Sequence, residues 1–306
     1  MYLNIFTYHS LDNKINMELP ENLKISTMTA TSQIYTNKEV LDISKIYENL
    51  SINNNIVYIE WANNTPKGLS PKQESHKKKK NKKVFFNQIT IVIVVENDYN
   101  NIKLFNNGAI SMTGVKSPKN GQRAVNILVE NINKIKDFLS FESKMEHFNV
   151  VWINSDYKSN FEIKRSELHQ LLVNKYNIFS SFEPCIYPGV MSKFFWNVDY
   201  KNKPNKLLGK CYCSNLCSGK GNGSGNGNCK KITISVFQSG SVIIGAQTFE
   251  QIIDGYNFIK GVFVKHNKEL KKVNAPFLDL EKNNSIVSKK KEKTIYYIRR
   301  SNIVYE

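Results

Sequence analysis

The sequence has no long hydrophobic run. Its longest apolar stretch, ITIVIVV, extends only from Ile89 to Val95, whereas a helix needs about 20 apolar residues to cross a bilayer. The first residues, MYLNIFTYHSLDNK, have neither the basic start nor the apolar centre of a signal peptide. We therefore expect no membrane partner and an intracellular, reducing location, in which the cysteines stay out of disulfides.

Catalytic patterns are also missing. The histidines are scattered and form no HExxH pair, and neither GxSxG nor the phosphate-binding patterns GxxxxGK[ST] and GxGxxG occur. The isolated Cys185 has no activating partner nearby in the sequence. We expect a protein that is not an enzyme, with no catalytic residue, no small-molecule substrate and no required cofactor.

Acidic residues are few compared with basic ones. The chain has 26 Asp and Glu against 43 Lys and Arg, a net charge of +17, and such an excess attracts polyanions, above all nucleic acid. Part of it lies in two runs, SHKKKKNKK from Ser75 to Lys83 and SKKKEK from Ser288 to Lys293. The alternative, that these lysines belong only to solvated loops and tails, remains open at this point.

Four of the five cysteines gather in one glycine-rich stretch, GKCYCSNLCSGKGNGSGNGNCKK, from residue 209 to 231. Cys211, Cys213, Cys217 and Cys229 have the spacing C-x-C-x3-C-x11-C. Four thiolates suit tetrahedral zinc, although the usual opening is C-x2-C. Two interpretations stay open, a structural zinc site and a flexible polar insertion with free thiols.

Two parts of the chain are alike. Each contains a β-rich run, then an aromatic residue with two polar residues and a glycine, another apolar run and an amphipathic helix. Phe105 and Phe237 begin the matching turns, and Gly108 and Gly240 supply the positive φ that a tight hairpin requires. The pattern predicts two repeats of one supersecondary unit.

Helix signals follow both hairpins. Ser117 precedes Pro118 as an N-cap precedes a first-turn proline, and Thr248 with Gln251 has the spacing of a capping box. Upstream, KISTMTATSQI and FNVVWINSDY read as strands, each followed by a helical segment. Helices that cover one face of an antiparallel sheet leave the other face available for binding.

The segment FSSFEPCIYPGV, from Phe179 to Val190, resembles the second repeat of the TATA-box-binding protein family. The hairpins LFNNGAISMTGVKS and VFQSGSVIIGA resemble that family's turns, and the resemblance extends roughly from Lys24 to Leu270. The insertions and the Lys/Asn-rich composition resemble divergent members encoded by large DNA viruses, which implies a viral factory in the host cytoplasm, or the host nucleus.

The resemblance implies an α+β fold, a pseudo-two-fold saddle. Two repeats of β-α-β(4)-α would form a curved antiparallel ten-stranded sheet with the helices on its convex face. The expected domains are an N-terminal extension at 1–23, repeat 1 at 24–142 with a basic insertion at 63–83, repeat 2 at 143–272 with a Cys/Gly-rich insertion at 207–230, and a basic tail at 273–306.

The resemblance also implies a DNA-binding surface. Aromatic wedges are expected at Phe105, Phe237 and Tyr187, with Asn55 or Ile56 at the fourth position. Thr27 and Trp152 align with the family's groove-reading asparagines, Thr113 keeps a threonine of the hairpin, and Lys116 and Lys193 align with phosphate contacts. Inserted apolar side chains hold a bend in A·T-rich DNA, whose steps unstack at lower cost.

A loop for a protein partner is implied as well. Glu183, Cys185 and Ile186 align with the stirrup loop that binds the B-type general transcription factor (TFIIB). The leading hypothesis is a general transcription initiation factor that bends A·T-rich double-stranded promoter DNA and recruits a TFIIB-like factor and RNA polymerase. The alternatives are an interaction adaptor that has lost sequence-selective DNA binding, and a zinc-stabilised virion or scaffold component.

Overall fold

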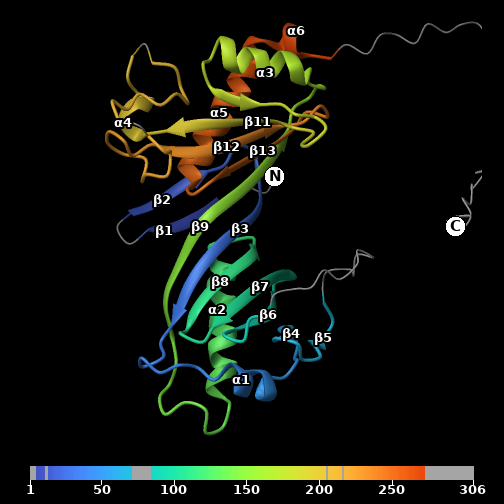
Figure 1. Ribbon diagram of the computed structural model, residues 1–306, viewed down its shortest axis with the longest axis vertical. Helices are drawn as coiled ribbons and strands as arrows, with labels where there is room; N and C mark the ends of the chain where they lie inside the picture. Colours follow the sequence, from blue (N-terminus) through green and yellow to red (C-terminus); the bar gives the residue numbers. More distant parts are fainter. Residues whose placement is uncertain (1–4, 11–12, 71–83, 205, 216, 273–306) are drawn as a thin grey trace, which may run out of the picture. The chain divides into compact units, whose positions relative to one another are not determined.

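The structure is a computed structural model, and it describes residues 5–10, 13–70, 84–204, 206–215 and 217–272. The predicted tail at 273–306 and residues 71–83 of the basic insertion lie outside the described residues. The elements, drawn in Figure 1, are β1 (Ile5–Ser10), β2 (Asn13–Glu18), β3 (Lys24–Ile34), α1 (Ile43–Asn49), β4 (Ile56–Glu60), β5 (Lys67–Gly68), β6 (Gln88–Val95), β7 (Asp98–Phe105), β8 (Ala109–Val115), α2 (Pro118–Asn133), β9 (Met145–Lys158), α3 (Arg165–Asn174), β10 (Phe179–Ser181), β11 (Val190–Trp196), α4 (Val198–Lys201), β12 (Lys230–Val236), β13 (Ser241–Ala246), α5 (Phe249–Lys265) and α6 (Asn267–Leu270).

One large antiparallel sheet contains eleven of the strands, in the order β10-β11-β12-β13-β9-β3-β8-β7-β6-β4-β5. The long strands β3 and β9 pair with each other at its middle, and Figure 1 shows them side by side. From β9 outward the order is β13, β12, β11 and β10, and from β3 outward it is β8, β7, β6 and β4. Hairpins connect β7 to β8 and β12 to β13.

The expected number of ten strands is wrong. The eleventh is β5, a two-residue strand that adds to the edge beyond β4, with Tyr58 opposite Gly68. Lys67 and Gly68 belong to the segment that was predicted to be a basic insertion. This part of the insertion pairs with the backbone N–H and C=O groups that β4 would otherwise leave free at the edge of the sheet. A separate two-stranded sheet pairs β1 with β2.

The predicted turns and caps are confirmed. Gly108 and Gly240 have φ of +80° and +82°, the left-handed region that only glycine enters without strain. The Ser117 side chain accepts a hydrogen bond from the Asn120 backbone N–H at the start of α2, and Thr248 accepts from Gln251 at the start of α5. Each cap satisfies a backbone donor that the first helical turn leaves without a partner.

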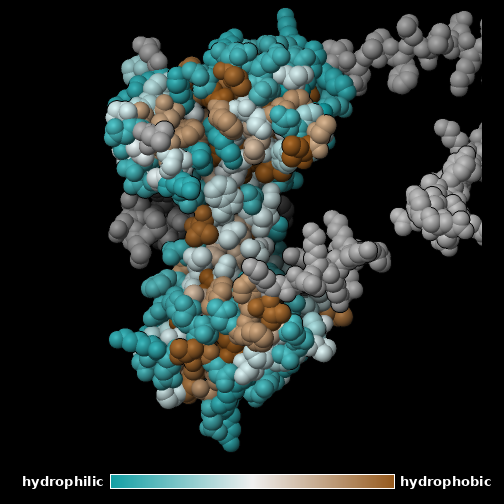
Figure 2. Space-filling model, viewed as in Figure 1, coloured by the Kyte–Doolittle hydropathy of each residue, from teal (hydrophilic) through white to brown (hydrophobic). Residues whose placement is uncertain are grey.

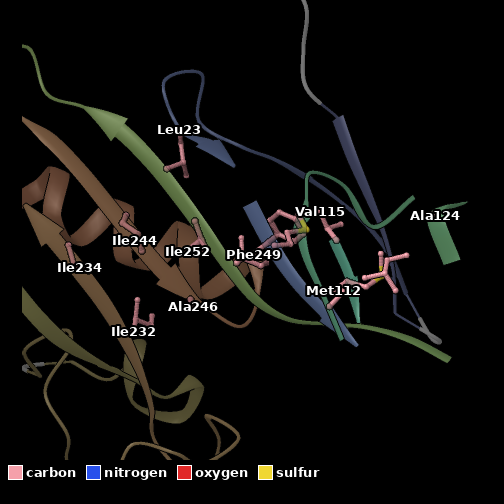
Figure 3. Packing of buried hydrophobic residues seen from close by; sticks show 14 of the residues in the cluster. Leu23, Met112, Val115, Ala124, Ile232, Ile234, Ile244, Ala246, Phe249 and Ile252 are labelled. Carbon is pink, nitrogen blue, oxygen red and sulfur yellow. The ribbon is translucent and has the colours of Figure 1, made fainter. Parts of the chain in front are cut away.

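The long helices α2 and α5 supply the core beneath the sheet. Ile252, Tyr256, Ile259 and Phe263 form the buried stripe of α5. Figure 3 shows part of the single buried cluster, which includes Ile232, Ile234 and Ile244 of the sheet with Ile252 of α5, and Met112 and Val115 of β8 with Ala124 of α2. Among the described helices, none is long and apolar enough to cross a membrane.

Side chains on the sheet alternate between this core and the opposite face. In β3, Met28, Ala30 and Ile34 are buried, whereas the threonines between them are partly exposed. We name the second face the open face, defined by the partly exposed or exposed residues Thr27, Thr29, Thr31, Thr113, Trp152, Asn154, Asp156, Lys193, Lys231, Thr233 and Ile243. In the view of Figure 2, atoms of intermediate hydropathy lie where β3 and β9 run in Figure 1.

Candidate nucleic-acid interface

Two of the predicted wedge residues meet at one end of the sheet. Tyr187, in the loop before β11, and Phe237, directly after β12, place their rings edge to face with centroids 5.7 Å apart. Gly189 lies against both rings, since a Cβ at this position would come within 2.9 Å of Tyr187 and 3.1 Å of Phe237. The pair therefore packs over a residue without a side chain, and Tyr187 remains 37% exposed.

Arg165, at the start of α3, connects the two loops that present this pair. Its guanidinium donates one hydrogen bond to the Pro188 carbonyl and a second, of 3.3 Å, to the side chain of Gln238. Pro188 follows Tyr187, and Gln238 follows Phe237. The planar Arg165 guanidinium, with its several N–H donors, thus holds the loop of Tyr187 and the turn of Phe237 at a fixed distance from each other. Nothing in the sequence indicated this role.

At the other end of the sheet, Phe105 ends β7 opposite Gln88. The expected fourth wedge position, Asn55 or Ile56, lies at the start of β4 instead. Ile56 is fully buried, and Asn55 donates its side-chain amide to the Val94 carbonyl. Neither position therefore carries the exposed apolar side chain that the prediction requires.

Strand register indicates that Phe86, rather than Asn55 or Ile56, occupies the fourth predicted aromatic position. Val190 of β11 pairs with Val236, the residue before Phe237, and Ile89 of β6 pairs with Leu104, the residue before Phe105. Tyr187 stands three residues before Val190, just as Phe86 stands three residues before Ile89. Phe86 is 66% exposed, so a large apolar ring is available there. The sequence signal was the pair Phe85-Phe86 before the strand ITIVIVV.

The middle of the open face brings together Thr27, Thr113 and Trp152. Thr29 of β3 pairs with Thr113 of β8 on one side and with Trp152 of β9 on the other, and Thr27 pairs with Asn154. The predicted groove-reading residues are therefore neighbours across three strands. Apart from the indole, the group consists of short polar side chains without charge.

Asn154 is an amide that the sequence analysis missed. Its side-chain oxygen accepts a hydrogen bond of 2.9 Å from the Trp152 indole N–H, which leaves the amide NH₂ as a donor on the open face. The indole lies over Gly245 of β13, where a Cβ would come within 2.8 Å of its ring. Side-chain alternation within β9 was the available signal, because Ile153 and Ser155 are buried on the other face.

The two predicted phosphate-contacting lysines, Lys116 and Lys193, lie at separate places around the middle of the open face. The Lys116 ammonium donates to the Ser26 carbonyl, and the Lys193 ammonium donates to the Thr233 hydroxyl at 2.9 Å. Burial lowers the pKa of Lys193, and the positive charge of nearby Lys231 lowers it further. Two close ammonium groups on a partly buried surface favour an anionic ligand.

The predicted partner loop is exposed. The Glu183 carbonyl accepts hydrogen bonds from the backbone N–H groups of Ile186 and Tyr187, which closes a tight turn. Cys185 is exposed, and Ile186 is 85% exposed. This turn presents an acidic and an apolar side chain next to the aromatic pair.

The four clustered cysteines lie in the connection between α4 and β12. Their sulfur atoms all lie within 4.8 Å of one another. Burial alone would raise the pKa of Cys213, yet hydrogen bonds from the Gly227 backbone and from the neighbouring cysteines lower it to about 7. The close approach of the four sulfur atoms makes the cluster a set of ligands that could hold a metal ion, at the end of β12 opposite Phe237.

Comparisons with known proteins identify the family. No protein-family model matches the chain. A protein of Acanthamoeba polyphaga mimivirus, described as TATA-box-binding protein-like, is 30% identical in an alignment 275 residues long that covers 82% of this chain and 67% of that protein. Methanococcus jannaschii TBP, a solved structure, shows 14% identity and a TM-score of 0.45, with 81% of this chain and 99% of that chain covered. On its similarity to the viral protein, the chain belongs to the TATA-box-binding protein-like family.

Proposed function

We propose that this chain is a non-enzymatic transcription initiation factor that binds A·T-rich promoter DNA in the minor groove and bends it. The observation that carries the proposal is the edge-to-face pair of Tyr187 and Phe237 at one end of the open face. A partly exposed aromatic pair can insert between base pairs as a wedge, and the loss of stacking is offset by the protein surface that the bent duplex then contacts.

A second wedge at the other end of the sheet completes the arrangement. Strand order is the same on both sides of the β3 and β9 pair out to β10 and β4, which supports the pseudo-two-fold repeat expected from the sequence. Phe86 and Phe105 then correspond to Tyr187 and Phe237. Two kinks separated by the middle of the open face would bend the duplex toward its major groove.

The middle of the open face suits the floor of an A·T-rich minor groove. That groove presents acceptor atoms, whereas a G·C pair adds an amino donor. The threonine hydroxyls and the Asn154 amide provide donors, and the side chains are small enough for close approach. Lys193 and Lys231 contact phosphates, which anchors the complex without reading sequence.

The turn that contains Glu183, Cys185 and Ile186 is the proposed contact for a TFIIB-like factor, through which RNA polymerase is recruited. Its acidic side chain attracts a basic partner, and the exposed Ile186 supplies apolar contact area.

A second candidate function is an interaction adaptor that has lost selective DNA binding. The observation in its favour is Asp156, a carboxylate on the open face that accepts a hydrogen bond from the Ser26 hydroxyl and lies opposite Ile243 of β13. A carboxylate at this position repels DNA phosphates. The wedge pair at one end and the lysines nearby favour the DNA-binding function.

Binding and bending of A·T-rich and G·C-rich duplexes, measured over a salt series, test the proposal. The Phe105→Ala/Phe237→Ala variant is compared with the unmodified chain. A preference for A·T-rich DNA that disappears in the variant supports the wedge mechanism. Weak binding that ignores sequence and both phenylalanines, and that vanishes with salt, contradicts it and favours the adaptor.

A further inference from the structure

The four clustered sulfurs have the spacing of a single tetrahedral metal centre. The Sγ atoms of Cys213 and Cys229 are 3.4 Å apart, and those of Cys229 and Cys211 are 3.8 Å apart. Four thiolates about 2.3 Å from one zinc ion have edges of about 3.8 Å. All five cysteines are free of disulfides, so the sulfurs are available as ligands.

Backbone hydrogen bonds connect the glycine-rich segment to Cys229 and its neighbour Asn228. The Gly221 N–H donates to the Cys229 carbonyl at 3.1 Å, and the Gly223 N–H donates to the Asn228 carbonyl at 2.7 Å. Gly223 has φ of +91°, and a Cβ there would come within 2.4 Å of the Trp196 ring. The alternating glycines therefore let two backbone segments approach closely, and they bring distant cysteines to one point.

An outer contact orients one of the sulfurs. Cys229 is fully buried, and the Asn197 side-chain amide donates to its Sγ at 3.5 Å and to the Gly225 carbonyl at 2.9 Å. Hydrogen bonds from such outer groups hold ligands in place and stabilise the negative charge of a thiolate. A cysteine that served only as a small apolar residue would have no need of this donor.

We propose that Cys211, Cys213, Cys217 and Cys229 bind one Zn²⁺ as four thiolates and that the ion fastens the Cys/Gly-rich insertion to β12. A set of four sulfurs favours zinc over hard cations that prefer oxygen ligands. Such a centre would carry a charge of −2, and two basic residues, Lys210 and Lys230, are each adjacent to a ligand in the sequence.

The ion has a consequence for the open face. The Lys231 N–H donates to the Gly219 carbonyl at 2.9 Å, and the aliphatic part of the Lys231 side chain packs against Gly219. The zinc-bound insertion therefore positions Lys231 beside Lys193. The cysteine cluster and the aromatic pair lie at opposite ends of β12. Zinc would therefore have a structural role and would not contact Tyr187 or Phe237.

Metal content of the purified full-length chain tests the proposal. We expect about one zinc ion per chain, and on replacement by Co²⁺ the absorption bands of a tetrahedral cobalt thiolate. Cys213→Ser should lower zinc retention at least tenfold, whereas Cys185→Ser, the matched control outside the cluster, should leave it unchanged. Zinc removal by a chelator should make the segment from residue 206 to 228 sensitive to protease, and zinc should restore its resistance.

Two results would overturn the zinc site. One is a chain without bound metal whose four thiols react freely or form a disulfide between Cys213 and Cys229. The other is zinc content unaffected by Cys213→Ser. If that variant fails to fold, the cobalt spectrum and the reversible chelation of the unmodified chain decide. None of these measurements uses DNA, so their outcome is independent of the proposed function.

Discussion

Tyr187 and Phe237 are far apart in the sequence, yet their rings meet with centroids 5.7 Å apart and planes at 63°. The contact depends on three features: the turn after Glu183, the hairpin at Gly240 and the space above Gly189. Changes at Gly189 and at Arg165 are expected to move the two rings apart without removing either of them.

Gly189→Ala adds a methyl group within 2.9 Å of Tyr187. The rings must separate, so we expect binding to A·T-rich DNA to fall about tenfold, which corresponds to about 1.4 kcal/mol, together with a smaller bend. Gly261→Ala is the matched control, because a Cβ there meets nothing within 4 Å. Equal behaviour of the two variants in a bending assay would argue against a role for the pair.

Phe86→Ala removes the exposed ring that stands before β6. If Phe86 is the fourth wedge, the bend angle falls as much as it does in Tyr187→Ala, with the fold retained because the ring is 66% exposed. Phe85→Ala, a change at the neighbouring residue, should have the smaller effect. Bend angles from circular permutation of the binding site distinguish the two variants.

Arg165→Lys keeps the charge but loses the planar group that reaches both Pro188 and Gln238. We expect weaker bending with nearly unchanged net electrostatic attraction, so the salt dependence of binding stays the same. Lys164→Arg, which likewise exchanges one basic side chain for the other at the adjacent residue, is the control. Unchanged bending in Arg165→Lys would show that the contacts to Pro188 and Gln238 do not position the aromatic pair.

Lys193 has a pKa below its ordinary value, and this predicts a pH effect. Between its lowered pKa in the folded chain and its value in the unfolded chain, the folded state binds fewer protons, so stability rises with pH in that window. DNA phosphates favour the charged form, so binding takes up protons there and weakens as pH rises. Lys193→Gln should remove this pH dependence and reduce the salt slope by about one.

Asp156→Asn removes the carboxylate from the open face and keeps an acceptor for the Ser26 hydroxyl. Because repulsion from phosphates is lost, we expect a several-fold gain in DNA affinity, largest at low salt. Glu130→Gln, on the exposed side of α2, changes the net charge equally and serves as control. An equal gain in both variants would show that only net charge matters.

Both hairpins and the helix caps were predictable, since each rests on a few adjacent residues. Gly108, Gly240, Ser117 and Thr248 all occur in the predicted conformation, because positive φ and side-chain capping are decided locally. The strand count was wrong by one because β5 forms by pairing with an available edge, and no pattern within two residues predicts that pairing.

Local residue patterns were sufficient to identify the family, the antiparallel hairpins, three of the aromatic candidates and the cysteine set. Strand pairing across the sheet was needed to show that Phe86, rather than Asn55 or Ile56, occupies the position equivalent to Tyr187, because the insertion before β6 hides this register in the sequence. The same applies to Asn154, to Arg165 and to the convergence of four thiols. These relationships join residues through packing and hydrogen bonds across strands, whereas periodicity and spacing report only on neighbours in the chain.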